Sequence, residues 1–174
     1  MRRHRTWMGS FIIALAASVI FPALAAAQDS PHIFKLLLEA KHQAFQLNRD
    51  ASEMETFNWT AVPMSFQSHT EQLIKMKDDV NTLVRQVMKL DEARGSAAPW
   101  QQAAIDRITP VLNELASNTT GAIELFNDNP KNRSNGEYED YIEANAAASA
   151  RLASMVSDYV HYGREQRRLA RLSE

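Results

Sequence analysis

The stretch that decides the fold is residues 66–90, FQSHTEQLIKMKDDVNTLVRQVMKL. Its apolar side chains recur at alternating steps of three and four residues, a spacing that is typical of the a and d positions where one helix faces others. We call these inward-facing positions the seam of the helix. The seam consists of Phe66, His69, Leu73, Met76, Val80, Leu83, Val87 and Leu90. Lysines outside it, such as Lys75 and Lys89, are expected on the solvent face.

The same periodicity recurs in three other segments, so the sequence predicts four helices, over about 31–58, 66–94, 99–127 and 136–171. In the first helix the predicted seam is Ile33, Leu37, Ala40, Ala44, Leu47, Ala51 and Met54. In the third helix it is Ile105, Ile108, Leu112, Leu115, Thr119, Ala122 and Phe126. In the fourth helix it is Tyr138, Tyr141, Asn145, Ala148, Leu152, Met155, Tyr159 and Tyr162.

Residues that start and stop helices stand between these segments. Ser30 and Pro31 suit the N-cap and the first helical position, and Gly95 suits a C-terminal stop. Long helices joined by short connections pack as antiparallel neighbours. The predicted fold is therefore all-α, an antiparallel up-down-up-down four-helix bundle. A dimeric coiled-coil hairpin is the alternative that the same seams support.

The N-terminal segment has the features of a secretory signal peptide. Three arginines within residues 2–5 precede an apolar run over residues 11–21, and small residues follow it up to Ala27. This order predicts cleavage before Gln28 and an exported protein, periplasmic or secreted, with residues 28–174 as a single domain. An uncleaved membrane anchor is the alternative, but residues 11–27 are short for a span and contain Pro22.

The composition excludes several classes of function. The chain has no cysteine, so thiol catalysis, cysteine-ligated metals and disulfides are excluded. Residues 1–27 hold three of the 19 Lys and Arg residues and none of the 21 Asp and Glu residues, which leaves residues 28–174 with a formal net charge of −5. A chain this acidic is not expected to bind nucleic acid, because binding to phosphates needs a basic face.

His69 is the strongest candidate for a ligand-binding residue, because it occupies a seam position. The antiparallel topology would place four further residues within about two turns of it. They are Met54, Thr119, Tyr141 and Asn145. These side chains could line a small pocket, or they could form a hydrogen-bonded polar layer that fixes the register of the bundle, with His69 bonded to Thr119 or Asn145.

Two other histidines allow a different interpretation. His32 and His161 are expected at the same end of the bundle, one on the first helix and one on the fourth, where they could ligate haem b. The architecture is similar to that of the soluble b-type cytochromes of four-helix type, although the chain shares no sequence motif with them. Neither histidine lies on a seam, which favours two surface side chains instead.

The last turns of the fourth helix are basic and could contact a membrane surface or an acidic partner. The side chains concerned are Arg164, Arg167, Arg168 and Arg171. No catalytic motif, metal-ligand motif or phosphate-binding loop occurs in the sequence. We therefore expect a cofactor-free, non-catalytic binding or interaction protein of unknown partner. A periplasmic bundle that carries haem, a metal or a small ligand is the alternative.

Overall fold

Four long helices make up nearly all of the chain that the computed structural model describes, which is residues 29–59, 66–128 and 136–173. The helices are α1 (Pro31–Trp59), α2 (Phe66–Glu92), α3 (Pro99–Asp128) and α4 (Gly136–Leu172), and a short 3₁₀ helix, η1 (Arg94–Ser96), follows α2. The predicted all-α fold is confirmed. The predicted signal peptide lies outside the described residues.

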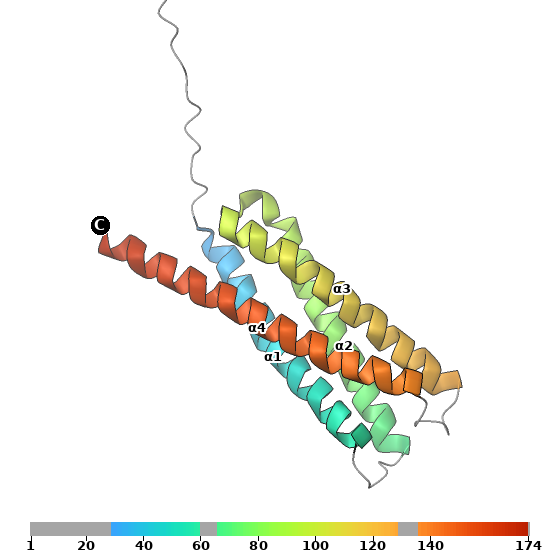
Figure 1. The fold of residues 1–174 in the computed structure, drawn as a ribbon. Coiled ribbons are helices and arrows are strands. Elements are labelled where there is room, and N and C mark those ends of the chain that lie inside the picture. Colours follow the sequence, from blue (N-terminus) through green and yellow to red (C-terminus); the bar gives the residue numbers. More distant parts are fainter. Residues whose placement is uncertain (1–28, 60–65, 129–135, 174) are drawn as a thin grey trace, which may run out of the picture.

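The four helices pack as a ring in which each contacts two neighbours: α1 packs on α2 and α4, and α3 packs on α2 and α4. Successive helices run in opposite directions, so the start of α1 and the end of α4 lie at the same end of the bundle (Figure 1). This is the predicted antiparallel four-helix bundle. None of the helices in the described ranges combines the length and the apolar character that a membrane span requires.

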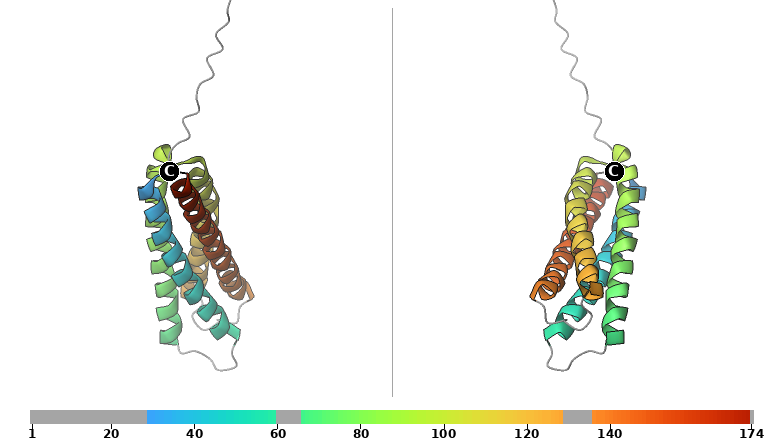
Figure 2. Two further views of the ribbon diagram at one scale, coloured as in Figure 1. Left: turned by 90° about the vertical axis from the view of Figure 1, so that its left-hand side faces the viewer. Right: turned by 90° about the vertical axis from the view of Figure 1, so that its right-hand side faces the viewer.

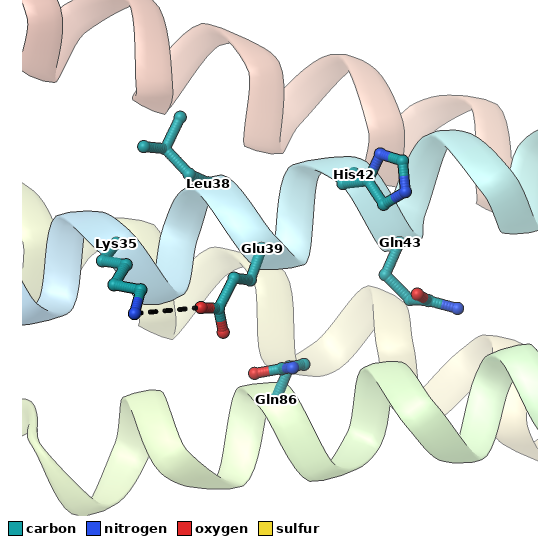
Figure 3. A pocket seen from close by; sticks show the side chains of 6 residues that line it. All are labelled: Lys35, Leu38, Glu39, His42, Gln43 and Gln86. Atoms are coloured by element: carbon teal, nitrogen blue, oxygen red, sulfur yellow. Dashed lines mark ion pairs between the residues drawn. The ribbon is translucent and has the colours of Figure 1, made fainter.

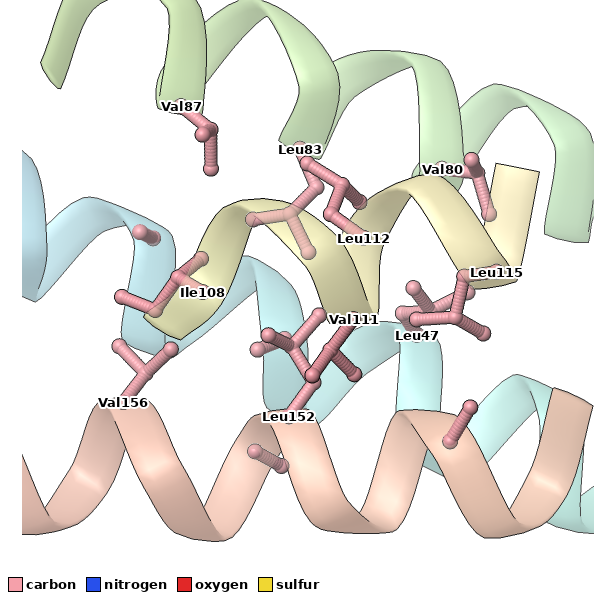
Figure 4. Packing of buried hydrophobic residues seen from close by; sticks show 14 of the residues in the cluster. Leu47, Val80, Leu83, Val87, Ile108, Val111, Leu112, Leu115, Leu152 and Val156 are labelled. Atoms are coloured by element: carbon pink, nitrogen blue, oxygen red, sulfur yellow. The ribbon is translucent and has the colours of Figure 1, made fainter. Parts of the chain in front are cut away.

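The predicted seams of the first three helices form the core. Every seam residue of α1 and α3, and of α2 from His69 onward, is at most 5% exposed. Side chains from all four helices converge on this interior (Figure 4). Helical periodicity located the core residues correctly because apolar burial is the main term that stabilises such a bundle.

The seam of α4 is a correction. In its C-terminal half the buried residues are Val156, Val160 and Gly163, whereas the predicted Met155 and Tyr159 are partly buried and Tyr162 is 48% exposed. Two alternative seams on α4, both with steps of three and four residues, share positions 138, 145 and 152. In the structure, the seam with the smaller side chains is the buried one. Aliphatic residues and glycine allow α4 to approach its neighbours closely, and tyrosine rings would not.

A buried glutamine joins the starts of α1 and α3. Gln101 is 0% exposed, and its Oε1 accepts hydrogen bonds from the backbone N–H groups of Ser30 (3.2 Å) and Ala98 (3.0 Å). Its Nε2 donates to Oδ1 of Asp29 (2.7 Å) and to the carbonyl of Ser30 (3.0 Å). One side chain thus satisfies backbone groups at two helix starts, where such groups have no partner within the helix.

Candidate functional site

His69 is buried, 4% exposed, near the start of α2. Its Nε2 is hydrogen-bonded to the hydroxyl of Tyr138 at the start of α4, and its ring stacks on Phe126 of α3 with 5.1 Å between centroids. The expected partners, Thr119 and Asn145, do not hold it. Tyr138 lies on the predicted seam, but the sequence does not indicate that its hydroxyl reaches across to α2.

The other predicted ligand-binding residues each make contacts different from those of His69. Thr119 Oγ1 donates to Asn145 Oδ1 (3.4 Å) inside the core, and Nδ2 of Asn145 is buried with no hydrogen-bond partner. Met54 is 0% exposed among apolar side chains. The Tyr141 ring covers Gly121, since a Cβ there would lie 2.6 Å from the ring. Of these four residues, only Thr119 and Asn145 form a buried polar contact between α3 and α4.

The residues of the haem alternative do not face the interior. His32 and His161 are both exposed, whereas a haem held between the helices needs axial ligands that point inward. Within the described ranges, no three His, Cys, Asp or Glu side chains lie close enough together to hold a metal ion.

The sequence does not predict the charged cluster between α1 and α2, although it places one member, Lys75, on the solvent face. Asp50 of α1 is 2% exposed, and its Oδ1 lies 2.7 Å from Nζ of Lys75 on α2. Gln46 donates to its other oxygen (2.9 Å), and Gln43 donates to Oδ1 of Asp79 (3.1 Å). Asp50 directly precedes the seam residue Ala51, so periodicity alone places it at the edge of the core and cannot identify its partner.

The two carboxyl groups of this cluster, Asp50 and Asp79, have opposite pKa shifts. Burial alone would raise the pKa of Asp50, but hydrogen bonds with Asp79, Lys75 and Gln46 outweigh burial and hold that pKa below its usual value. Burial raises the pKa of Asp79 to about 7, and its hydrogen bond with Asp50 and the charge of Asp50 raise it further, against the effect of Lys75. Asp79 therefore takes up a proton at a much higher pH than an ordinary aspartate, while Asp50 stays ionised.

Beside this cluster, α1 and α2 form a shallow polar depression (Figure 3). An ion pair between Lys35 and Glu39 (3.9 Å) crosses one side of it, and His42 lies exposed on another. Its lining is mostly long, flexible polar side chains, so it offers no rigid apolar surface to a ligand.

An open apolar surface lies between α3 and α4. We call it the aromatic groove, and it has a volume of about 440 Å³. Its lining residues are Trp100, Ala103, Arg107, Met155, Asp158, Tyr159 and Tyr162. The rings of Trp100 and Tyr162 meet edge to face with 5.6 Å between centroids, and the Tyr159 hydroxyl donates to the carbonyl of Ala103 (3.3 Å). The groove exists because α4 turns these tyrosines away from the core, which the predicted seam did not anticipate.

The four arginines at the end of α4 have two different environments. Arg167 forms a salt bridge with Asp29 (2.5 Å), and its guanidinium lies 3.7 Å from the centre of the Phe34 ring. It therefore holds the end of α4 against the start of α1. Arg164, Arg168 and Arg171 are exposed.

Comparison of the chain with models of known protein families, with curated proteins and with solved structures finds no match.

Proposed function

We propose that this chain is an exported helical-bundle binding protein that acts without catalysis, and that it binds its partner in the aromatic groove. The observation that carries the proposal is the grouping of the exposed Tyr162 with the partly buried Trp100, Tyr159 and Met155 around one groove. Aromatic side chains held open to solvent beside a groove are typical of binding surfaces, because they offer much contact area at little cost in conformational entropy.

The lining residues indicate the chemistry of the occupant. Trp100 and Tyr162 offer ring faces and edges to an aromatic or aliphatic group, and Met155 supplies a polarizable apolar floor. Arg107 and Asp158 carry opposite charges in the same groove, so they can hold a polar or charged group attached to that apolar part. These side chains provide no nucleophile paired with a base, which supports binding as the role of the groove.

The groove can be tested with anilinonaphthalene sulfonate, an apolar aromatic dye that carries one negative charge. We expect the dye to bind the parent protein and the Tyr162→Ala variant to weaken that binding by about tenfold, since an aromatic contact of this kind is worth roughly 1 kcal/mol beyond its buried area. The matched control is Met88→Ala, which removes an equally exposed apolar side chain from α2. Equal loss of dye binding in both variants would refute the proposed binding surface.

Export requires a separate measurement. If residues 1–27 are a cleaved signal peptide, the exported protein should begin near Gln28 and fractionate without detergent. Sequencing of its N-terminus decides the question. A membrane-bound form that still begins with Met1 or Arg2 would show that the segment is retained.

A further inference from the structure

The last turns of α4 project beyond the bundle. Gly163 is the last buried residue of α4, and of the residues described after it Arg167 alone is partly buried. Figure 1 shows the end of α4 leaving the other helices, and Figure 2 shows this end at the same end of the molecule as the start of α1. We call residues 164–172 the α4 tip.

The α4 tip has a basic side and an apolar side next to each other. Arg164, Arg168 and Arg171 follow one another at steps of four and three residues and so lie along one stripe of the helix. Leu169 and Leu172 are 59% and 76% exposed and, together with the acidic Glu165, continue the stripe that includes the exposed Tyr162 of the aromatic groove. A helix with adjacent basic and apolar stripes is suited to lie in the interface of a membrane.

The charge of the α4 tip indicates what kind of surface it binds. Residues 28–174 carry a formal net charge of −5, yet residues 164–174 contain four arginines and two acidic residues, Glu174 and Glu165, the latter 3.7 Å from Arg168. The tip is therefore a positive region on an acidic molecule. An anionic surface would attract the tip and repel the rest of the bundle, which orients the molecule with α4 toward that surface.

The start of α1 lies at this same end. The Asp29–Arg167 salt bridge holds the first described residue against α4. The chain therefore enters α1 beside the α4 tip.

We propose that the α4 tip binds the surface of a membrane that contains anionic phospholipids, with Arg164, Arg168 and Arg171 on the headgroups and Leu169 and Leu172 inserted below them. Each arginine near such a surface contributes roughly 1 kcal/mol, and each leucine adds the burial of its apolar area. The bundle itself stays outside the membrane, and the nearby Trp100 and Tyr162 lie where aromatic side chains favour the interface.

The test is flotation of the protein with vesicles of phosphatidylglycerol and phosphatidylcholine in equal parts, against vesicles of phosphatidylcholine alone. The protein is expressed from the complete gene, and all variants are compared after the same processing of the N-terminal segment. One variant combines Arg168→Gln with Arg171→Gln, and a second combines Leu169→Gln with Leu172→Gln. The matched controls make the same changes at exposed residues of α2. They are Lys77→Gln with Arg85→Gln, and Ile74→Gln with Met88→Gln.

We expect the parent protein to float with the anionic vesicles and not with the neutral ones. Both tip variants should weaken this partitioning by about tenfold or more, while both controls stay within about twofold of the parent. Circular dichroism checks that every variant keeps its helices. The proposal is wrong if the parent does not bind, if the controls lose as much as the tip variants, or if the leucine pair has no effect. The proposal would also be wrong if the α4 tip bound an acidic protein and did not bind the vesicles.

Discussion

Lys75 and Asp50 form an ion pair across the contact between α1 and α2, with 2.7 Å between Nζ and Oδ1, in which the carboxylate is 2% exposed and the ammonium group is half exposed. Lys75 thus neutralises a charge that the fold has removed from water. Lys75 lies outside the α2 seam and is exposed, as expected, but the helical periodicity does not indicate its ion pair with Asp50.

Replacing Lys75 by alanine should destabilise the fold by about 1–3 kcal/mol, because it leaves the Asp50 carboxylate buried with hydrogen bonds but no cation. The half-exposed lysine keeps the estimate below the value for a fully buried pair. Chemical denaturation measures the change. Lys89→Ala is the matched control on the same helix, and it should stay within about 0.5 kcal/mol. Equal midpoints for the two variants would contradict a structural role for the pair.

The opposite pKa shifts of Asp50 and Asp79 predict how stability depends on pH. The folded pKa of Asp79 is raised to about 7 from an ordinary value of 3.8, so the folded state binds the extra proton between these values. Its stabilising contribution is complete below the ordinary value and is lost as pH rises through about 7. Asp50, whose pKa is lowered, acts in the opposite sense: its contribution is present above the ordinary value and is lost as pH falls below it.

Asp79→Asn should remove the loss of stability between about pH 4 and pH 7, because an amide donates to Asp50 without a titrating proton. We expect the variant to be more stable than the parent by about 1–2 kcal/mol at about pH 8, after allowance for partial exposure, and similar to it at about pH 5. Melting temperatures across pH test this. Other charges face the pair, namely Lys75, Glu53 and Asp78. Asp91→Asn, on the exposed side of α2, is the control, and the same pH profile in both variants would refute the assignment.

Particular residues show where sequence reasoning succeeded and where it stopped. Leu83 and Leu112 were placed correctly because apolar periodicity reports which side of a helix is buried. The Asp50–Lys75 pair was not found, because periodicity within one helix does not give the relative register of two. The predicted phase of α4 was wrong at Tyr141, where Ile142 is buried instead, and again from Met155 onward, since two phases fit the apolar pattern and only the space beside the neighbouring helices distinguishes them. The aromatic groove depends on that choice of phase.

Gln101 shows the same limit at the helix starts. Its side chain makes four hydrogen bonds to Asp29, Ser30 and Ala98, and nothing in the spacing of the sequence indicates them. Gln101→Leu has a similar volume but leaves these groups without partners, so it should cost about 2–3 kcal/mol in denaturant unfolding. Gln67→Leu, at an exposed position of α2, should be near neutral. A small effect for both would mean that water replaces the glutamine at no cost.

Gly163 links the core to the aromatic groove. A Cβ at this position would lie 2.6 Å from the Trp100 ring and 2.7 Å from the Phe34 ring, distances that force the rings to move. Alanine is favoured over glycine within a helix by about 1 kcal/mol, but overpacking against two rings costs about 1–3 kcal/mol, so Gly163→Ala should be destabilising by about 1 kcal/mol.

The same substitution should also weaken dye binding in the groove, because displacement of Trp100 changes its contact with Tyr162. Gly95→Ala is the matched control, since a Cβ at Gly95 meets nothing within 4 Å. Thermal unfolding and dye titration of the two variants measure both effects. If Gly163→Ala were as stable as the control and bound the dye equally well, α4 would not approach Trp100 and Phe34 as closely as the structure indicates, and the geometry assigned to the groove would be wrong.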